Sequence, residues 1–169
     1  VHIHVNDTVD VYGNRLVYSG EEKIANLFDD VKLVDKKTTL STQHLIFNRN
    51  NNIAFYNVGG EIINEENTLT SKIGRYHTNS KILYFRNDVV LINPDSETYS
   101  DTLIYNTISK TAFFKGPTVI RGESSTIYCE DGWYDTENDF SKLSKRPSIS
   151  NAEQTITADS LFYNNNTSY

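Results

Sequence analysis

Three carboxylates of this sequence are equally spaced. Asp101, Glu130 and Asp159 follow one another at a constant interval of 29 positions. A pair of carboxylic acids is what most glycoside hydrolases need, one as general acid and the other as base or nucleophile. The same interval also reaches Gln43 and Lys72, which suit neither role. We therefore interpret this polar column as a solvated face or as a position that stabilises a β-bulge. A carbohydrate-active β-helix remains an alternative.

Histidine and cysteine offer little further chemistry. His2 and His4 alternate in the opening residues, so a strand would present both imidazoles on one face. Two ligands without a third or fourth make a weak zinc site, and we expect an exposed strand face and no metal. Cys129 is the single cysteine and is interpreted as a small buried side chain. No catalytic residue and no cofactor is predicted.

A repeat with this same period of 29 positions contains the carboxylate column and Cys129. Its clearest unit, residues 68–92, predicts two strands joined by a polar turn at 77–80, with a kink at Asn87 and Asp88, which tolerate unusual backbone angles. Agreement of several columns in one register establishes the repeat. The aromatic column is Tyr18, Phe47, Tyr76, Tyr105, Tyr134 and Tyr163. The large apolar column is Leu27, Tyr56, Phe85, Phe114 and Leu143. The aliphatic column is Leu33, Ile62, Leu91, Ile120 and Ile149. The small column is Thr42, Ser71, Ser100, Cys129 and Ala158.

The composition and the turns predict an all-β protein. The chain has 169 residues, 37% of them apolar, with 11 Tyr and 8 Phe, and it shows no helical stripe. We expect a single domain of repeat units at about 10–38, 39–67, 68–96, 97–125 and 126–154, with a partial unit at 155–169. Polar turns recur twice in each unit, which favours an antiparallel meander of two strands per repeat. A parallel β-helix with one coil per repeat is the alternative.

The strands cannot all be regular. Positions 54, 56, 60 and 62 share one apolar face, while Phe55, Tyr84 and Phe113 make the opposite face partly apolar. Tyr76 is out of phase with Leu69, so one extra residue must be absorbed near Lys72 as a β-bulge. Bulges in both strands would fold the meander into a V-shaped trough of two facing sheets with an apolar interior. Pro147 removes a ladder donor, which predicts an edge strand or an irregular one.

The net charge and the two ends of the sequence bear on the kinds of partner to expect. The net charge of −6 gives no reason to expect a nucleic-acid partner. No apolar run has the length of a membrane span. The chain begins without Met or a leader, and we take it as a mature or trimmed form. The half unit at its end predicts an edge that docks a partner, or a fragment of a longer protein.

The repeats resemble those of the OstA/LptA-like family. The segments TLSTQHLIFNRNNNIAFYNVGGEII, TLTSKIGRYHTNSKILYFRNDVVLI and TITADSLFYNNN carry the likeness. The Asp29-Asp30-Val31 and Asn87-Asp88-Val89 triplets match the GNV-like element of the family. Residues 58–60 and 116–118 depart from that element. The family repeat also has an opening motif, which residues 155–161 (TITADSL) match most closely.

The resemblance implies a repetitive antiparallel β-jellyroll that binds lipopolysaccharide and carries it across the periplasm without catalysis. It implies a bridge component or the soluble domain of the outer-membrane translocon. Such domains hold the acyl chains of lipid A in an apolar groove and pair head to tail, through edge strands, with copies of themselves or with other transport proteins. The candidate groove is Phe47, Tyr76, Tyr105, Tyr134, Leu27, Tyr56, Phe85, Phe114, Leu33, Ile62, Leu91 and Ile120. The competing interpretation of these columns is an ordinary core, in a structural repeat protein that assembles end to end.

Overall fold

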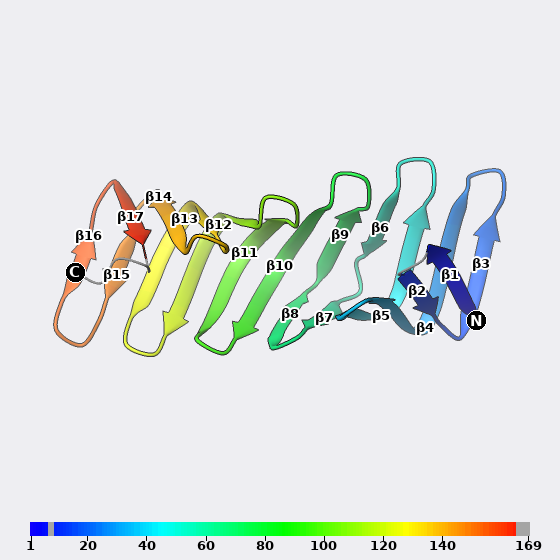
Figure 1. Cartoon of the computed structure of the whole chain (residues 1–169), viewed down its shortest axis with the longest axis horizontal. Coiled ribbons are helices and arrows are strands. Elements are labelled where there is room, and N and C mark those ends of the chain that lie inside the picture. Colours follow the sequence, from blue (N-terminus) through cyan, green and yellow to red (C-terminus); the bar gives the residue numbers. More distant parts are fainter. Residues whose placement is uncertain (7–8, 165–169) are drawn as a thin grey trace.

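A computed structural model describes residues 1–6 and 9–164 of the chain, and the described part is built from strands (Figure 1). Within these residues, hydrogen bonds join 17 strands into one sheet. Their bounds are β1 (His2–Asn6), β2 (Val9–Tyr12), β3 (Arg15–Ser19), β4 (Ile24–Asp35), β5 (Thr38–Asn48), β6 (Ile53–Tyr56), β7 (Gly60–Asn64), β8 (Asn67–Ser71), β9 (Ile73–His77), β10 (Ile82–Asn93), β11 (Ser96–Asn106), β12 (Thr111–Gly122), β13 (Thr126–Asp135), β14 (Phe140–Ser144), β15 (Ser148–Ser150), β16 (Thr155–Thr157) and β17 (Ser160–Asn164).

The sheet is an antiparallel meander. Long strands such as β4, β5 and β10 to β13 cross its full width, and the others are split into two shorter strands that continue one another, as β9 and β8 do beside β10. Every pairing among the described strands is antiparallel. The parallel β-helix alternative is therefore wrong, because a coil-per-repeat helix would pair its strands in parallel.

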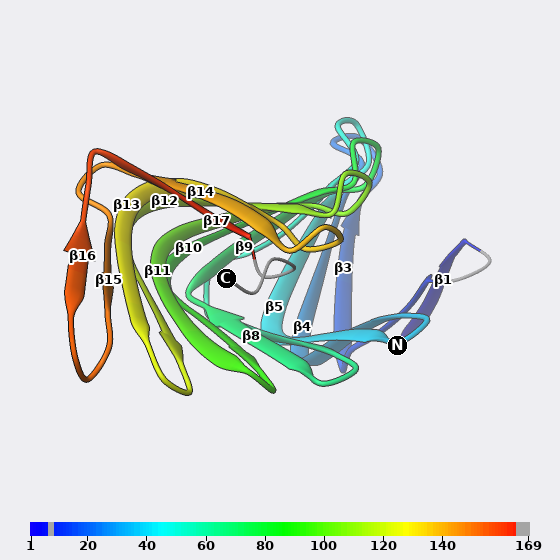
Figure 2. The ribbon, with the colours of Figure 1, turned by 60° about the vertical axis from the view of Figure 1, so that its left-hand side comes forward.

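A line of bulges bends the sheet across all its strands. Asp29 and Asp30, and two repeats later Asn87 and Asp88, have positive φ angles between 52° and 64°, and the register shifts there. On the intervening strands a single residue is absorbed, as at Lys72 between β8 and β9. The kink predicted at Asn87-Asp88 and the bulge predicted near Lys72 are both confirmed. The bend turns the sheet into a V-shaped trough (Figure 2).

The two walls of the trough are named here the upper and lower arms, after their place in Figure 1. The upper arm ends in the turns that follow β3, β5, β9, β11 and β13, and the lower arm ends in the turns that follow β4, β7, β10, β12 and β15. Neighbouring upper turns are joined by backbone hydrogen bonds. The amides of Thr78, Thr107 and Thr136 donate to carbonyls 26 residues earlier, and each hydroxyl donates to the same carbonyl.

Pro147 lies inside the sheet instead of at its edge. It separates β14 from β15, and the two strands are flanked by β13 on one side and by β17 and β16 on the other. Lys145 and Arg146 before it take positive φ angles and form a bulge. The bulge therefore lies next to the residue that has no backbone N–H to donate. Of the two predictions for this strand, irregularity is correct and an edge position is wrong.

Outward-facing side chains form a cross-strand line on the upper arm, which we call the outer row. Phe55, Phe113 and Trp133 belong to it because their neighbours along each strand face the buried interior. Successive pairings define the row as Val17, Asn26, Ile46, Phe55, Arg75, Tyr84, Ile104, Phe113, Trp133, Lys142 and Phe162. The partly apolar outer face predicted from Phe55, Tyr84 and Phe113 is confirmed.

Candidate binding groove

The floor of the trough is a dry seam along the bend. Val31, Val89, Thr118 and Cys129 are each at most 2% exposed, and the pairings place them in one line with the hydroxyl residues of the small column. Cys129 has the small buried role that its column predicted. Burial, more than the nearby Asp131 carboxylate, raises the pKa of its thiol to about 11, so the thiol stays protonated near neutral pH.

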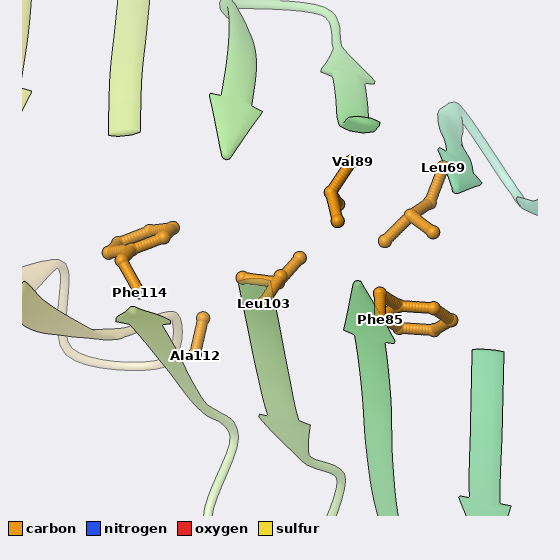
Figure 3. Packing of buried hydrophobic residues seen from close by; sticks show 6 residues of the cluster. All are labelled: Leu69, Phe85, Val89, Leu103, Ala112 and Phe114. Atoms are coloured by element: carbon orange, nitrogen blue, oxygen red, sulfur yellow. The ribbon is translucent and has the colours of Figure 1, made fainter. Parts of the chain in front are cut away.

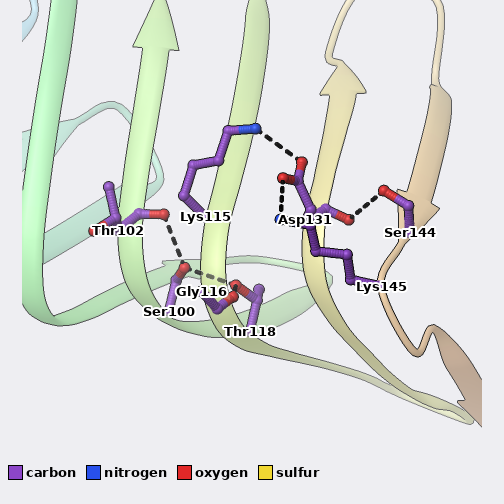
Figure 4. Close-up of polar contacts among 8 residues, drawn as sticks. All are labelled: Ser100, Thr102, Lys115, Gly116, Thr118, Asp131, Ser144 and Lys145. Carbon is purple, nitrogen blue, oxygen red and sulfur yellow. Dashed lines mark hydrogen bonds and ion pairs between the residues drawn. The ribbon is translucent and has the colours of Figure 1, made fainter.

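Hydroxyl groups in the seam close the single-residue bulges. The Ser71 hydroxyl donates to the carbonyl of Ile73, and the Ser100 hydroxyl bonds to the carbonyl of Thr102, at 3.0 Å in both cases. Ser100 and Thr118 also share a 2.8 Å hydroxyl contact across two strands (Figure 4). At both bulges a hydroxyl thus bonds to the carbonyl two residues later, where the ladder is interrupted. The small column is therefore small and mostly hydroxylated for a structural reason.

The large apolar column above the floor is core. Leu27, Tyr56, Phe85, Phe114 and Leu143 are between 2% and 4% exposed. Phe85 and Phe114 belong to one packed cluster, which also includes Leu69, Val89, Leu103 and Ala112, and Figure 3 shows them on either side of Leu103. A second cluster in the N-terminal part is built on Val11, Leu27, Val31, Leu45 and Ala54. For these four candidate groove residues of the column (Leu27, Tyr56, Phe85 and Phe114), packing against protein is what the geometry supports.

Tyr56 sits where two glycines leave room for it. A Cβ placed on Gly74 would overlap the Tyr56 ring, and one on Gly60 would lie 2.6 Å from it. The Tyr56 hydroxyl shares a 2.7 Å hydrogen bond with Ser71, and burial raises the pKa of Tyr56. Sequence reasoning missed Gly74, although its position alternates between leucine and glycine in successive repeats, at Leu45, Gly74, Leu103 and Gly132.

The remaining candidate residues line the trough and are half-buried. Phe47, Tyr76, Tyr105 and Tyr134 lie on the upper arm, and Leu33, Ile62, Leu91 and Ile120 lie on the lower arm. They pack against the edges of the two clusters and keep part of their surface free. Two apolar walls thus face each other across the floor, which is the arrangement that a long apolar ligand needs.

A cavity of about 140 Å³ lies between the walls near the middle of the chain. Its lining is mostly apolar and draws on both clusters: Leu33, Leu40, Leu45, Ala54, Tyr56, Ile62, Tyr76, Leu83 and Phe85 contribute to it. Asp35 also lines it, and its Oδ1 is buried without a hydrogen-bond partner among the described residues. The sequence analysis did not single out Asp35, because the equivalent residues of the next two repeats are Asn64 and Asn93, which lie in segments predicted to be polar turns.

Tyr134 in the upper wall contacts a carboxylate. Its hydroxyl donates a short hydrogen bond to Oδ1 of Asp139 in the adjoining turn. Burial first, and then the Asp139 carboxylate, raise the pKa of Tyr134 well above its usual value. The phenol is therefore neutral and fixed in the upper wall.

The polar column lies on the outer side of the bend and braces it. Lys72 forms an ion pair with Asp88 at 2.5 Å, and the Gln43 amide donates to Asp30 at 3.4 Å. Glu130 pairs with Arg146 with the signs reversed. In each case a residue of the single bulge contacts the double bulge of a neighbouring strand, which agrees with the interpretation of this column as a bulge-stabilising position.

The N-terminal histidines converge on a carboxylate. His2 Nε2 and His4 Nδ1 lie 2.7 and 3.0 Å from the same Oδ1 of Asp10 on β2, and the hydrogen bond from His4, followed by that from His2, lowers the pKa of Asp10. The shared face predicted for the two histidines is confirmed. No group of three or more His, Cys, Asp or Glu residues in the described ranges is arranged to hold a metal ion. Within the same ranges, no helix has the length and apolarity to cross a membrane.

Comparison with known proteins places the chain in a family. A model of the family described as OstA-like protein matches residues 1–101, and no curated protein matches the chain. One similar solved structure is that of LptH, the LptA homologous periplasmic component of the conserved lipopolysaccharide transport device from Pseudomonas aeruginosa. It is 13% identical, with 86% of this chain and 94% of that chain covered, and its TM-score of 0.37 makes the likeness a distant one. Since the family model spans more than half of the 169 residues, this chain belongs to the family of OstA-like proteins.

Proposed function

We propose that this chain is a non-enzymatic carrier of lipopolysaccharide in the periplasm, and that residues 1–169 act as one module. The observation that carries the proposal is the pair of half-exposed apolar walls above a fully buried floor. A buried floor stabilises the fold, while the walls leave apolar surface that a soluble monomer rarely retains without a use. The acyl chains of lipid A are ligands of the right chemistry for such a groove.

Both ends of the sheet support a head-to-tail assembly. β3 and β1 end the sheet at the N-terminal side, and β17 and β16 end it at the C-terminal side. Open edges of this kind add strands from a neighbour unless they are covered. The proposed partners are other lipopolysaccharide-transport proteins or further copies of this chain, with the module acting as a bridge component or as the soluble domain of the outer-membrane translocon.

Photo-crosslinking to lipopolysaccharide tests the groove. A photoreactive residue is placed at Phe47, Tyr76 or Tyr105 in the upper wall, and at Phe85 in the core. Asp101, exposed on the outside of the bend, is the control position. We expect strong crosslinks from the wall positions, weak ones from Phe85 and none from Asp101. Crosslinks that are equally strong at Asp101, or absent at every wall position, would refute a lipid groove.

A structural scaffold that assembles end to end is the second candidate, and the same open edges favour it. The two functions separate in one experiment on purified protein. Sedimentation velocity over a range of concentrations measures assembly, and lipid extraction followed by mass spectrometry measures cargo. The double variant Thr155→Lys with Thr157→Lys changes the exposed edge strand β16 and should block end-to-end assembly. If the groove hypothesis is correct, the amount of bound lipid should not change. Assembly without bound lipid would favour the scaffold.

A further inference from the structure

The outer row gives the upper arm a second apolar surface, on the side of the sheet opposite to the groove. Val17, Tyr84 and Phe162 on this row are 49%, 37% and 63% exposed. Rings also touch along it, since Trp133 packs at 5.5 Å against Phe140, and Phe140 stacks with Phe162. No described element covers this face (Figure 2), so aromatic side chains stand in a band across the outside of the arm.

Cations accompany these rings. Arg75 lies over the ring of Phe55 at 5.5 Å, and Lys142 lies over that of Phe162 at 5.4 Å. Arg86 faces the same side as Tyr84, two residues nearer the bend. None of these three forms an ion pair with another described residue. The acids of this face are already engaged: Asp131 binds Lys115 and Lys145, and Asp135 accepts hydrogen bonds within its own turn.

The charge of this face opposes that of the whole molecule. The chain has a net charge of −6, yet the outer face of the upper arm keeps unpaired cations beside exposed rings. On the outer face of the lower arm, by contrast, charges of opposite sign lie at one ring. There Glu97 accepts a hydrogen bond from Tyr99, and Arg121 lies over the same Tyr99 ring at 5.2 Å. The upper face is therefore selectively suited to a negatively charged partner that also accepts apolar groups.

We propose that the outer face of the upper arm docks on the surface of an anionic lipid membrane. Aromatic rings with a polar rim settle at the level of lipid headgroups, and Lys and Arg beside them are attracted to anionic lipids. The alkyl stems of Arg and Lys add apolar contact while their charged ends reach the phosphates. A nucleic acid fits less well, because aliphatic residues of the outer row such as Ile46 and Ile104 find an apolar region in a membrane interface but not along a phosphate backbone. This docking goes beyond the carriage of lipid in the groove, since it uses the other side of the sheet.

The chain carries its own reporter for this contact. Trp133 is the single tryptophan and lies on the outer row. We expect vesicles of equal parts phosphatidylglycerol and phosphatidylcholine to shift its fluorescence to shorter wavelength, and brominated acyl chains in those vesicles to quench it. Vesicles of phosphatidylcholine alone should do neither. Added salt should weaken the binding because it screens the attraction between the cations and the headgroups.

Charge reversal locates the docking face. The double variant Arg75→Glu with Lys142→Glu should weaken binding to the anionic vesicles at least tenfold, as measured by co-sedimentation. The matched control is Lys32→Glu with Arg121→Glu, which makes the same change of charge on exposed residues of the lower arm and should change binding less than threefold. Thermal unfolding followed by circular dichroism should confirm that both variants are folded.

Other outcomes would overturn the proposal. Equal losses in the two double variants would mean that only the total charge matters. Quenching that survives the Arg75 and Lys142 reversal, but is lost when the groove residue Tyr105 is changed to Glu, would mean that Trp133 senses lipid in the groove. Tighter binding to single-stranded DNA than to anionic vesicles, at equal salt, would assign the face to nucleic acid instead.

Discussion

Two columns of the repeat have similar residues and different environments. The column of Tyr56, Phe85 and Phe114 is almost fully buried, whereas the column of Tyr76 and Tyr105 keeps part of its surface free. Both belong to the upper arm and face the interior. The difference follows from their distance to the bend: near the floor the two walls meet and exclude water, and farther up they diverge. An aromatic column in a repeat therefore does not by itself distinguish a core from a groove.

Truncation at one residue of each column should separate them most clearly. Phe85→Ala should lower the free energy of unfolding by about 3 to 5 kcal/mol, because it leaves a cavity in a packed cluster. Tyr105→Ala should cost only about 1 kcal/mol, since its surface is already partly solvated. Guanidinium titrations measure both. Similar losses in the two variants would show that Tyr105 is core and would remove it from the groove.

The glycines beside Tyr56 sharpen the comparison within the buried column. Gly74→Ala should lower the free energy of unfolding by about 1 to 3 kcal/mol, because the new methyl group overlaps the Tyr56 ring. Combining it with Tyr56→Leu, the residue that Leu27 and Leu143 supply in other repeats, should recover part of that loss. Gly20→Ala, whose Cβ would lie 3.9 Å from its nearest neighbour, is the control. A loss in the double variant equal to the sum of the single losses would exclude steric coupling.

The buried floor should begin to lose stability at a lower alkaline pH than the upper wall, where the Tyr134 phenol has an ordinary pKa of 10.0 that burial raises further. The pKa of Cys129 is raised to about 11 in the folded state, so folding favours the protonated thiol. Its contribution is complete below the unfolded value near 9 and is lost as the pH rises through 11, by at most about 3 kcal/mol. Chemical denaturation from pH 8 to 11 measures this slope. Cys129→Ser should reduce it and should still fold, because Ser100 fills the equivalent position. An unchanged slope would assign the effect to other groups.

The smallest effect is expected outside the bend. Lys72→Ala removes an ion pair between exposed side chains, which should change the free energy of unfolding by less than about 0.5 kcal/mol. Ser71→Ala, one residue away but in the floor, should cost about 1 to 2 kcal/mol, because it leaves the Tyr56 hydroxyl and a bulge carbonyl unpaired. Thermal and denaturant unfolding of the two variants provide the measurement. A larger loss for Lys72→Ala would contradict the contrast between floor and exterior.

Much of the fold could be predicted from the sequence because every repeat shows the same pattern of apolar, polar and turn residues. The turns, the antiparallel order and the bulges at Asn87 and Lys72 all followed from periodicity and from residues that tolerate unusual backbone angles. The site was only partly predictable. How far two walls diverge depends on the angle of the bend, which no single residue encodes, so Phe85 and Tyr105 looked equivalent. Tyr56 and Gly74 became a pair only when the register was known, since they belong to different strands that the pairing of β6 with β9 brings together.

Successive upper turns are joined by equivalent hydrogen bonds, so the length of the trough depends on the number of repeats. Each repeat contributes two strands, and strands in a sheet are spaced by a little under 5 Å, so one repeat adds about 10 Å to the long axis. A deletion or duplication of one whole repeat would keep Thr78, Thr107 and Thr136 opposite equivalent acceptors and would preserve every bulge. The length of such a protein can therefore change by whole repeats while the shape of the trough in cross-section stays the same.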